Sequence, residues 1–394
     1  MCGINFIQSS FEINKINIFK ELDKVDSFIK KNQINKILKL IRNLKRNQIY
    51  IELIEKNNQN LKKKLLQIEK KLIKKKKLSN FDLIDDVIWI IKKEILKDIK
   101  NLKKFLIDNK IKISNKSIIF FRYYFCSLES LNYLETRGRD SLGLSINFLI
   151  KRKIDVLNSR KVNNNKINFF QNKVSKDLYL VNLVLKYANP IGYAGENINK
   201  IKTLLKHSKI INNVNFEDIK SFFIIGHTRW ASIGEVNLSN CHPFINCHKN
   251  TNSFFYMNGD ILNHDKLTSE IKDNDNFSII DKNCKNDLKL IPNELYKNSK
   301  INIKELNGSF VLVYHQSEKP FRLSILKKGT QGLYIGNNND ENFLLSSDVY
   351  GVVNNTDKYQ KVSDNKTIEI NPFKVNKKII KKSDLISTKI STKD

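Results

Sequence analysis

A cysteine at the second position of the chain could act as a nucleophile that carries its own base. Initiator methionine is usually removed when the next residue is small, and its removal here would give Cys2 a free α-amino group. The thiolate is the attacking form of cysteine. An α-amino group titrates near pH ~7.7–8.0, so it can accept the thiol proton at neutral pH without a histidine. Cys2 is therefore the first candidate catalytic residue.

The composition limits the class of protein. The 394 residues suffice for one large domain or two ordinary ones. No run of 18 apolar residues is present, and the start lacks the basic and then apolar pattern of a secretory signal. Five scattered cysteines favour a reducing compartment over a disulfide framework. We therefore expect a cytoplasmic protein with no membrane segment.

The formal net charge of +30 raises the question of a nucleic-acid partner. Lysine, asparagine and isoleucine dominate throughout the chain, however, and all three have AT-rich codons. A biased genome would therefore produce this charge without selection for a partner. Aromatic residues are not interleaved with the basic runs, and no nucleic-acid motif occurs. Nucleic acid is not the partner that the sequence favours.

The first part of the chain changes character after a short apolar segment. Residues 2–8 are typical of a strand, whereas residues 15–110 have helical periodicity. Leu61, Leu65 and Ile68, for example, recur at steps of four and three residues. These residues predict helical hairpins with lysine-rich outer faces. Such faces are typical of a solvated insertion, and a docking arm for an anionic partner is the alternative.

The rest of the chain has a globular pattern. It predicts a buried helix over 117–134, a strand over 144–150, and a mostly helical region over 160–220 with a turn at 189–192. Alternating apolar residues then predict strands at 222–225, 254–257, 309–314, 322–327, 333–335 and 343–346. The Asn-Gly pairs at 258–259 and 307–308 predict tight turns.

Five short motifs occur in a characteristic order. They are CGI at 2–4, LETRGRDS at 134–141, GHTRWAS at 226–232, HP at 242–243 and NG at 258–259. Together they resemble the class II (N-terminal nucleophile) glutamine amidotransferase domain. Within that class they resemble the glutaminase half of glutamine–fructose-6-phosphate aminotransferase (glucosamine-6-phosphate synthase). The amidophosphoribosyltransferase and asparagine synthetase branches match less well.

This resemblance covers residues 1–8 and about 117–375, and it implies a fold. The implied fold is an α/β (α+β) N-terminal-nucleophile four-layer sandwich with two mainly antiparallel sheets. We expect four segments: a first strand at 1–14, a helical lysine-rich insertion at 15–112, the remainder of the amidotransferase domain at 113–375, and a charged tail at 376–394.

The resemblance also implies catalytic roles. Cys2 would attack the side-chain amide of glutamine, form a glutamyl thioester and release ammonia. The Asn258 side-chain amide and the Gly259 backbone N–H would hold the oxyanion, although Asn-Gly could equally be a hairpin turn. Arg137 and Gly138 resemble the pair packed against the nucleophile, and would otherwise form an ordinary loop.

Recognition of glutamine would depend on charged groups that complement its α-groups. Arg229 matches the residue that binds the α-carboxylate. Asp287 is the candidate for the α-ammonium, but the flanking threonines of the family are missing, and a surface aspartate at a helix start is the alternative. Trp230 resembles a mobile indole that closes the site, with a core aromatic as the alternative. Ser232 and His242 complete the expected substrate-binding set.

The sequence departs from the family at two positions and contains one rival site. Ile233 and Met257 stand where the family usually has histidine. The four residues that could instead bind zinc are Cys241, His242, Cys247 and His248. Adjacent residues of a strand point to opposite faces, which disfavours convergence of all four. We therefore expect neither a metal nor a cofactor.

The resemblance leaves the acceptor of ammonia unassigned. In the family, two sugar-isomerase domains follow the glutaminase half, whereas here the resemblance ends near residue 375. The expected partner is a separate sugar-phosphate isomerase chain or domain, and the expected substrate is glutamine. The alternative is a non-catalytic scaffold that docks a partner through its basic helices. The departures at Ile233 and Met257 favour that alternative, and the retention of Cys2 and Asn258 favours the enzyme.

Overall fold

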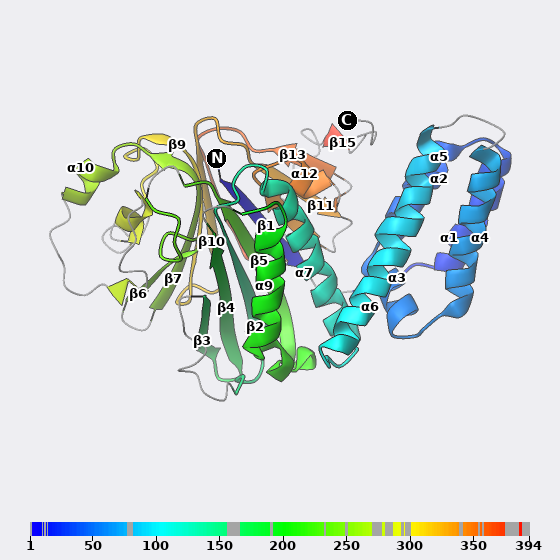
Figure 1. Cartoon of the computed structure of the whole chain (residues 1–394), viewed down its shortest axis with the longest axis horizontal. Helices are drawn as coiled ribbons and strands as arrows, with labels where there is room; N and C mark the ends of the chain where they lie inside the picture. Colours follow the sequence, from blue (N-terminus) through cyan, green and yellow to red (C-terminus); the bar gives the residue numbers. More distant parts are fainter. Residues whose placement is uncertain are drawn as a thin grey trace. The chain divides into compact units, whose positions relative to one another are not determined.

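The chain forms two compact units, and each is described separately (Figure 1). One comprises residues 1–10 and 123–388, and the other comprises residues 11–122. The computed structural model describes residues 2–9, 11, 13, 15–76, 82–155, 166–189, 192–231, 234–248, 251–269, 278–279, 287–292, 295, 301–338, 342–353, 355–356, 358–374 and 386–387. No helix within these ranges is long and apolar enough to cross a membrane.

The unit of residues 11–122, here called the helical unit, is built from amphipathic helices. They are α1 (Ile18–Lys30), α2 (Ile34–Leu44), α3 (Asn47–Ile54), α4 (Gln59–Lys76), α5 (Asp82–Trp89), a π-helical stretch (Ile90–Lys97) and α6 (Asp98–Asp108). Leu61, Leu65 and Ile68 of α4 lie on one face and are fully buried. The opposite face of α4 carries lysines, and Lys64 and Lys71 pair with aspartates of α1 at 2.9 and 2.7 Å. These exposed pairs contribute little to stability, so apolar burial holds the unit together.

The other unit, here called the core unit, contains two sheets whose neighbouring strands run antiparallel. The large sheet has the order β15-β13-β11-β12-β1-β5-β2-β4-β3, and the small sheet has the order β14-β10-β9-β7-β6-β8. The strands of the large sheet are β1 (Gly3–Ser9), β2 (Ser141–Ile150), β3 (Ile167–Ser175), β4 (Leu178–Ala188), β5 (Ile219–Arg229), β11 (Tyr334–Asn338), β12 (Asn342–Ser346), β13 (Lys358–Lys361) and β15 (Ile386–Ser387). Those of the small sheet are β6 (Phe244–His248), β7 (Thr251–Ile261), β8 (Ser278–Ile279), β9 (Gly308–Gln316), β10 (Leu323–Lys328) and β14 (Lys366–Ile370). The predicted pair of mainly antiparallel sheets is confirmed.

An apolar core lies between the two sheets. It joins Ile4 and Phe6 of β1 to Tyr256 of β7 and to Val311 and Val313 of β9. Every side chain of β1 is buried. Because β1 is central in the large sheet, between β12 and β5, its N-terminal end is held firmly inside the domain.

Helices cover the outer face of the large sheet. Helix α7 (Asn115–Leu134) begins in the helical unit and ends in the core unit, and α9 (Glu196–Ser208) packs on β2 and β4. Figure 1 shows both helices lying along that sheet. The Ser130 hydroxyl accepts a 2.7 Å hydrogen bond from the buried Asn5 amide, which ties α7 to β1. A Cβ at Gly226 would lie 2.4 Å from Leu131, so this glycine permits close packing of α7 on β5.

Two local predictions are wrong. Residues 160–220 were expected to be mostly helical, but β3 and β4 form an antiparallel pair there, and only α9 is a long helix. Asn258-Gly259 was expected to be a tight turn, but both residues lie inside β7, opposite Val311 and Phe310 of β9. The polar composition of the first segment concealed its alternating apolar residues, and the second segment continues as a strand on both sides of the glycine.

Candidate active site

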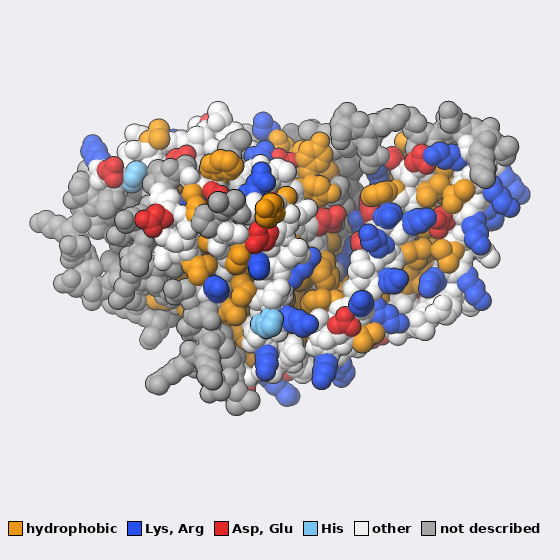
Figure 2. Space-filling model, viewed as in Figure 1, with side chains coloured by type: hydrophobic (Ala, Val, Ile, Leu, Met, Phe, Trp, Pro, Cys, Tyr) orange, Lys and Arg blue, Asp and Glu red, His pale blue; other side chains and the backbone are white. Residues whose placement is uncertain are grey.

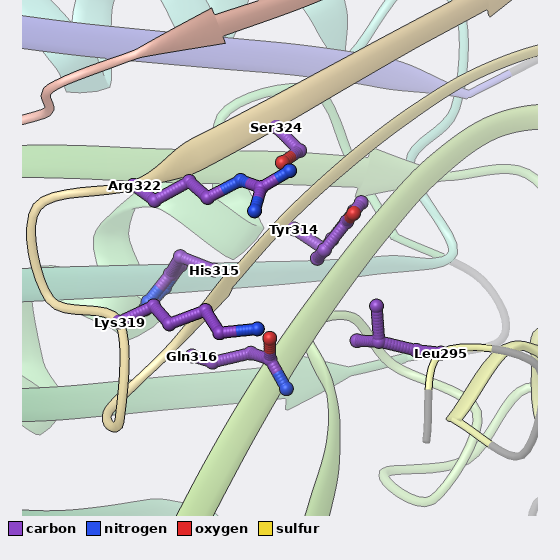
Figure 3. A pocket seen from close by; sticks show the side chains of 7 residues that line it. All are labelled: Leu295, Tyr314, His315, Gln316, Lys319, Arg322 and Ser324. Carbon is purple, nitrogen blue, oxygen red and sulfur yellow. The ribbon is translucent and has the colours of Figure 1, made fainter. Parts of the chain in front are cut away.

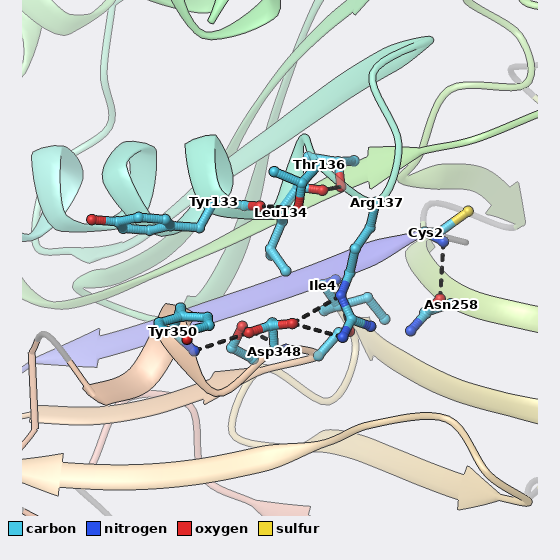
Figure 4. A network of polar contacts seen from close by, with 12 residues as sticks. Cys2, Ile4, Tyr133, Leu134, Thr136, Arg137, Asn258, Asp348 and Tyr350 are labelled. Atoms are coloured by element: carbon cyan, nitrogen blue, oxygen red, sulfur yellow. Dashed lines mark hydrogen bonds and ion pairs between the residues drawn. The ribbon is translucent and has the colours of Figure 1, made fainter. Parts of the chain in front are cut away.

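Cys2 and Asn258 lie side by side although they belong to different sheets. Cys2 immediately precedes β1 of the large sheet, and Asn258 lies on β7 of the small sheet. The Cys2 backbone N–H donates to Asn258 Oδ1 at 3.1 Å (Figure 4). The Asn258 side chain is fully buried, and its Nδ2 has no hydrogen-bond partner among the described residues. Asn258 thus keeps a buried N–H donor available beside the cysteine.

Gly259 follows Asn258 in a conformation that suits glycine alone. Its φ is +107°, and a Cβ at this position would lie 2.0 Å from the Ser309 carbonyl oxygen on β9. A side chain there would therefore combine backbone strain with a backbone clash. Glycine at this position therefore allows β7 to continue past Asn258 in close contact with β9.

The Cys2 thiol faces the chain that leaves β5. Cys2 Sγ donates a weak hydrogen bond to the Trp230 carbonyl oxygen at 3.7 Å. Trp230 itself is 51% exposed, whereas its neighbour Arg229 is only 4% exposed and donates from Nη1 to the Glu235 carbonyl at 3.2 Å. The Trp230 side chain is therefore exposed at the surface while its backbone carbonyl faces the thiol, and the Arg229 side chain is buried.

Burial raises the pKa of the Cys2 thiol above its ordinary value. The positive charge of Arg229 offsets part of this shift, whereas the carboxylate of Asp260 adds to it. The thiol is therefore protonated at neutral pH in this environment. A nucleophile at this position requires a base within reach of its proton.

The loop between α7 and β2 packs against the same segment. A Cβ at Gly138 would lie 2.5 Å from the Trp230 backbone nitrogen. Asp140 holds the segment from both sides, because its N–H donates to the Arg229 carbonyl at 3.0 Å and its Oδ2 accepts from the Ala231 N–H at 2.8 Å. The position of Trp230 is thus fixed by main-chain contacts on either side of it.

Arg137 of this loop forms an ion pair at the start of β1. Its Nε and Nη2 lie 2.9 and 2.6 Å from Asp348 Oδ2. The other oxygen of Asp348 accepts from the Tyr350 N–H at 3.0 Å, and Figure 4 shows the arginine reaching from the loop to this carboxylate. The pair links the α7–β2 loop to the end of β12, next to the strand that carries Cys2.

Asp287 is buried at the far end of β7. It begins a short 3₁₀ helix (Asp287–Leu290), and its Oδ2 accepts from the Ile261 N–H at 2.7 Å. Burial, with a contribution from the nearby Asp260 carboxylate, raises the pKa of Asp287 from 3.8 to about 6. The carboxylate is thus charged at neutral pH at an energetic cost, which a bound cation would offset.

A hollow in the core unit, away from Cys2, is too small for an amino-acid substrate. It lies at the ends of β9 and β10, where Figure 3 shows Tyr314, His315 and Arg322 among its lining side chains. Its volume of about 10 Å³ matches one water molecule. The residues around Cys2 are therefore the better candidate for substrate chemistry.

The comparisons with known proteins point to the same family as the sequence motifs. A family model described as a glutamine amidotransferase domain matches residues 197–387. The glutamine–fructose-6-phosphate aminotransferase [isomerizing] of Buchnera aphidicola subsp. Acyrthosiphon pisum is 28% identical over 211 residues, which is 48% of this chain and 32% of that protein. The chain carries a class II glutamine amidotransferase domain.

Other relatives share this domain and differ in name. The same aminotransferase of Clostridium acetobutylicum is 27% identical and covers 58% of this chain and 30% of its own length. The amidophosphoribosyltransferase of Methanocaldococcus jannaschii is 26% identical and covers 30% of this chain and 26% of its own length. A solved structure titled as the allosteric regulatory enzyme of purine biosynthesis aligns with a TM-score of 0.36 at 15% identity, over 63% of this chain and 46% of that one. The chain spans about a third or less of the length of the curated relatives named here.

The structure brings together several of the residues that the sequence singled out in the amidotransferase domain. Cys2 contacts both Asn258 and Trp230, and Gly138 abuts Trp230. Asp287 contacts β7 at Ile261, which follows Asn258 by three residues. Ser232 and Ile233 lie outside the described residues, as do the neighbours of Asp287 at 280–286.

His242 occupies a buried position beneath β7. Its Nδ1 accepts from the Met257 N–H at 3.1 Å, while His227 Nε2 lies 2.7 Å from the Met257 carbonyl oxygen. The two imidazoles stack with centroids 4.0 Å apart, and burial lowers the pKa of both well below 6.5. Two neutral histidines therefore hold both backbone polar groups of the residue before Asn258.

The sequence did not assign roles to Asp140, His227 or Asp348. Asp140 and His227 belong to two of the recognised motifs, so their position beside assigned residues was an available signal. Asp348 lies 211 residues from its partner Arg137, and nothing local in the sequence indicates the pair. Within the described residues no group of three or more histidine, cysteine or acidic side chains is arranged to hold a metal ion.

Proposed function

We propose that this chain hydrolyses glutamine at Cys2 and that the ammonia serves amino-sugar synthesis. One observation carries the proposal: the Asn258 amide has its oxygen 3.1 Å from the Cys2 nitrogen, while its buried Nδ2 has no hydrogen-bond partner in the part of the chain that the structure describes. A buried donor without a partner is costly, so a ligand that supplies an acceptor there gains free energy. The oxyanion formed when a thiolate attacks an amide is such an acceptor.

The proposed mechanism uses the cysteine's own amine as base. After removal of Met1, the α-amine takes the thiol proton, and the thiolate attacks the side-chain carbonyl carbon of glutamine. The oxyanion is held by Asn258 Nδ2 and the Gly259 N–H. The α-amine then returns the proton to the leaving nitrogen, ammonia departs, and water hydrolyses the glutamyl thioester. After removal of Met1, an α-amine that keeps the hydrogen bond to Asn258 Oδ1 still has its lone pair for this proton transfer.

The remaining residues of the site would bind and enclose the substrate. Arg229 pairs with the α-carboxylate and Asp287 with the α-ammonium of glutamine, while the exposed Trp230 closes over the bound molecule. Arg137 and Gly138 fix the loop that positions Trp230. His242, whose Nδ1 accepts from the Met257 N–H, acts on the substrate through the position of β7.

The finer assignment concerns the acceptor of the nitrogen. The names of most of the relatives that match, glutamine–fructose-6-phosphate aminotransferase [isomerizing], support a sugar phosphate, which a sugar-isomerase chain or domain would hold. The amidophosphoribosyltransferase match leaves a phosphoribosyl acceptor as the second candidate.

The function is tested by ammonia release from glutamine. We expect the protein with a verified N-terminal cysteine to release ammonia and Cys2→Ala to be inactive, with Cys126→Ala as the matched control. A residue fused ahead of Cys2 should abolish hydrolysis, because an amide nitrogen has no basicity near neutral pH. The analogue 6-diazo-5-oxonorleucine should label Cys2 alone. Label on an internal cysteine, or full activity with a fused N-terminus, would overturn the mechanism.

The acceptor is tested separately. Addition of fructose 6-phosphate and purified sugar-isomerase domain should convert released ammonia into glucosamine 6-phosphate, measured by mass spectrometry. Hydrolysis without this product, but with transfer to phosphoribosyl pyrophosphate in the presence of a phosphoribosyltransferase domain, would support the second candidate.

A further inference from the structure

A cavity in the helical unit is lined by none of the residues assigned to the amidotransferase site. It has a volume of about 310 Å³ and is formed by α1, α2 and the residues at the ends of these helices. Its lining consists of Ile16, Glu21, Lys24, Phe28, Lys36, Lys39, Leu40, Asn43, Leu44 and Arg46. Cavities that bind small molecules begin at about 300 Å³, so this volume suits a compact ligand.

Both helices turn one regular stripe toward this cavity. On α2 the stripe runs Lys36, Lys39, Leu40, Asn43 and Leu44, at spacings of three and four residues. Residues at these spacings lie one above another on a helix. Leu40 and Leu44 are buried, whereas both lysines are exposed. The cavity therefore has an apolar floor and a cationic rim.

The charges around the cavity are mostly uncompensated. Glu21 pairs with Lys24 at 2.5 Å, which leaves two lysines and Arg46 as an excess of positive charge. The Arg46 Nε is buried and has no hydrogen-bond partner among the described residues. The Lys36 amine lies 5.8 Å from the centre of the Phe28 ring, the one aromatic side chain of the lining. Cations at the rim and a buried unpaired donor favour an anionic ligand.

Polar contacts fix the wall that carries Arg46. The Gln48 side chain holds Ile16 from both sides, at 2.8 Å to its N–H and 3.0 Å to its carbonyl oxygen. Lys45 pairs with Glu94 at 2.9 Å, and its carbonyl accepts from Arg122 at 2.8 Å. The backbone on either side of Arg46 is thus anchored, so little order has to be gained when a ligand binds.

We propose that this cavity binds a small molecule composed of an apolar or aromatic body and a phosphate group. The apolar body would lie on Phe28, Leu40 and Leu44, and the phosphate would pair with Lys36, Lys39 and Arg46. A phosphate suits this rim because it offers several acceptor oxygens to separate cationic donors. The Lys and Arg side chains over the helical unit are otherwise interspersed with acidic and apolar ones, without a continuous basic stripe on the face in view (Figure 2).

The probe for this site is 4-methylumbelliferyl phosphate, which joins an aromatic body to a phosphate. Isothermal titration calorimetry with the full chain should show one site. The probe should bind at least about tenfold more tightly than inorganic phosphate or 4-methylumbelliferone alone, because only the probe uses floor and rim together. Raising the salt from low to high concentration should weaken binding of the probe and leave binding of 4-methylumbelliferone unchanged.

Matched double variants distinguish binding in the cavity from non-specific attraction to the positive charge of the chain. The double variant Lys36→Gln with Arg46→Gln should bind the probe about tenfold or more weakly. Lys62→Gln with Lys63→Gln removes the same charge from exposed positions of α4 outside the cavity and should leave affinity within about twofold. Equal weakening by both pairs would show non-specific attraction and overturn the proposal.

A third variant tests the cavity itself without a change of charge. Asn43→Trp should fill the space between the two helices and abolish probe binding, with the far-ultraviolet circular dichroism spectrum unchanged. Probe binding that survives in folded Asn43→Trp would overturn the proposal. Displacement of the probe by a single-stranded oligonucleotide, with no displacement by inorganic phosphate, would instead assign the rim to nucleic acid.

Discussion

The two ends of the Asn258 side chain have different tasks in the proposed reaction. Its oxygen accepts from the Cys2 N–H, while its buried nitrogen has no partner among the residues that the structure describes. Asn258→Asp keeps the acceptor and removes the donor, so it separates these tasks. We expect the rate of hydrolysis to fall by about 10²–10³, the usual loss of one oxyanion donor, with little change in glutamine affinity. Steady-state kinetics and calorimetry measure the two effects, with Asn337→Asp on β11 as the control. Equal losses in rate and affinity would show that Asn258 holds the substrate instead.

The pH dependence of hydrolysis reports the base. Because burial raises the pKa of the Cys2 thiol, little thiolate forms at neutral pH without a proton acceptor. An α-amine with a pKa near ~7.7–8.0 is protonated below this range and then cannot take the thiol proton. The rate at saturating glutamine should therefore fall about tenfold per pH unit below the amine pKa. A rate that is constant down to pH 6 would exclude the α-amine as base.

The charged Asp287 carboxylate should destabilise the folded protein and strengthen the binding of glutamine. Its pKa is about 6 in the folded protein, above its usual 3.8, so the folded state binds the proton more tightly than the unfolded state. The charged carboxylate therefore destabilises the fold above about pH 6, and this cost vanishes below pH 4. Asp287→Asn should raise the free energy of unfolding by roughly 2–3 kcal/mol at pH 7.5, an upper bound, and by about half of that at pH 5.

The same variant should weaken glutamine binding, since it removes the negative charge that pairs with the α-ammonium. We expect the KM for glutamine to rise by at least about tenfold at pH 7.5. Thermal unfolding across pH and steady-state kinetics test the two effects together. A stabilised Asp287→Asn protein with an unchanged KM would show that this aspartate has a structural role alone.

At the scale of elements, the site depends on close contact between a loop and the end of a strand. Gly138 has no room for a Cβ, because the backbone of Arg229 and Trp230 lies 2.5–2.6 Å from that position. Gly138→Ala should therefore displace the segment that carries both side chains. We expect higher KM for glutamine and faster solvent quenching of Trp230 fluorescence, with a cooperative unfolding transition retained. Gly195→Ala, whose Cβ would lie 3.7 Å from Asn132 but whose φ is +83°, serves as the control for backbone strain without a steric clash.

Helices and strands were predictable from the sequence where the spacing of apolar residues was regular. Strands β5, β7, β9 and β12 were expected from alternating apolar residues, and α7 from its long apolar run. The pair β3 and β4 was not, because buried polar residues such as Asn182 and Lys186 interrupt the apolar alternation of β4. A single sequence gives no sign that a neighbouring strand will accept a hydrogen bond from a buried asparagine, as Asn147 Oδ1 does from Asn182 Nδ2 at 2.6 Å.

The active site, like the secondary structure, was only partly predictable from the sequence. Cys2 and Asn258 were recognised as parts of motifs, but Asn-Gly has a strong local preference for turns. Only the pairing of β7 with β9 shows that Gly259 continues a strand with a φ of +107°. The departure at Met257 also became interpretable only from the fold. The Met257 side chain lies in an apolar cluster on the small sheet, while His227 and His242 hold its backbone. The fold thus accommodates the loss of a histidine there.

At the scale of the whole molecule, the helical unit should be dispensable for hydrolysis. None of the assigned catalytic or substrate-binding residues lies within residues 11–122, and the helices α1 to α6 bury their apolar faces within that unit. Replacement of residues 15–112 by a short flexible linker should leave a folded core unit. The kcat and KM for glutamine should change by less than about threefold, since long surface loops cost little closure entropy.

The design of this deletion must take account of α7, which is divided between the two units. Phe120 and Phe121 on its first half are fully buried, and Phe121 packs on Phe105 of α6 with ring centroids 5.1 Å apart. Removal of α6 would expose the Phe121 ring, and an exposed apolar patch promotes aggregation. The deletion should therefore carry Phe121→Gln, and the same substitution in the full chain is the control. Loss of hydrolysis by a deletion protein that unfolds cooperatively would show that the helical unit builds or gates the active site.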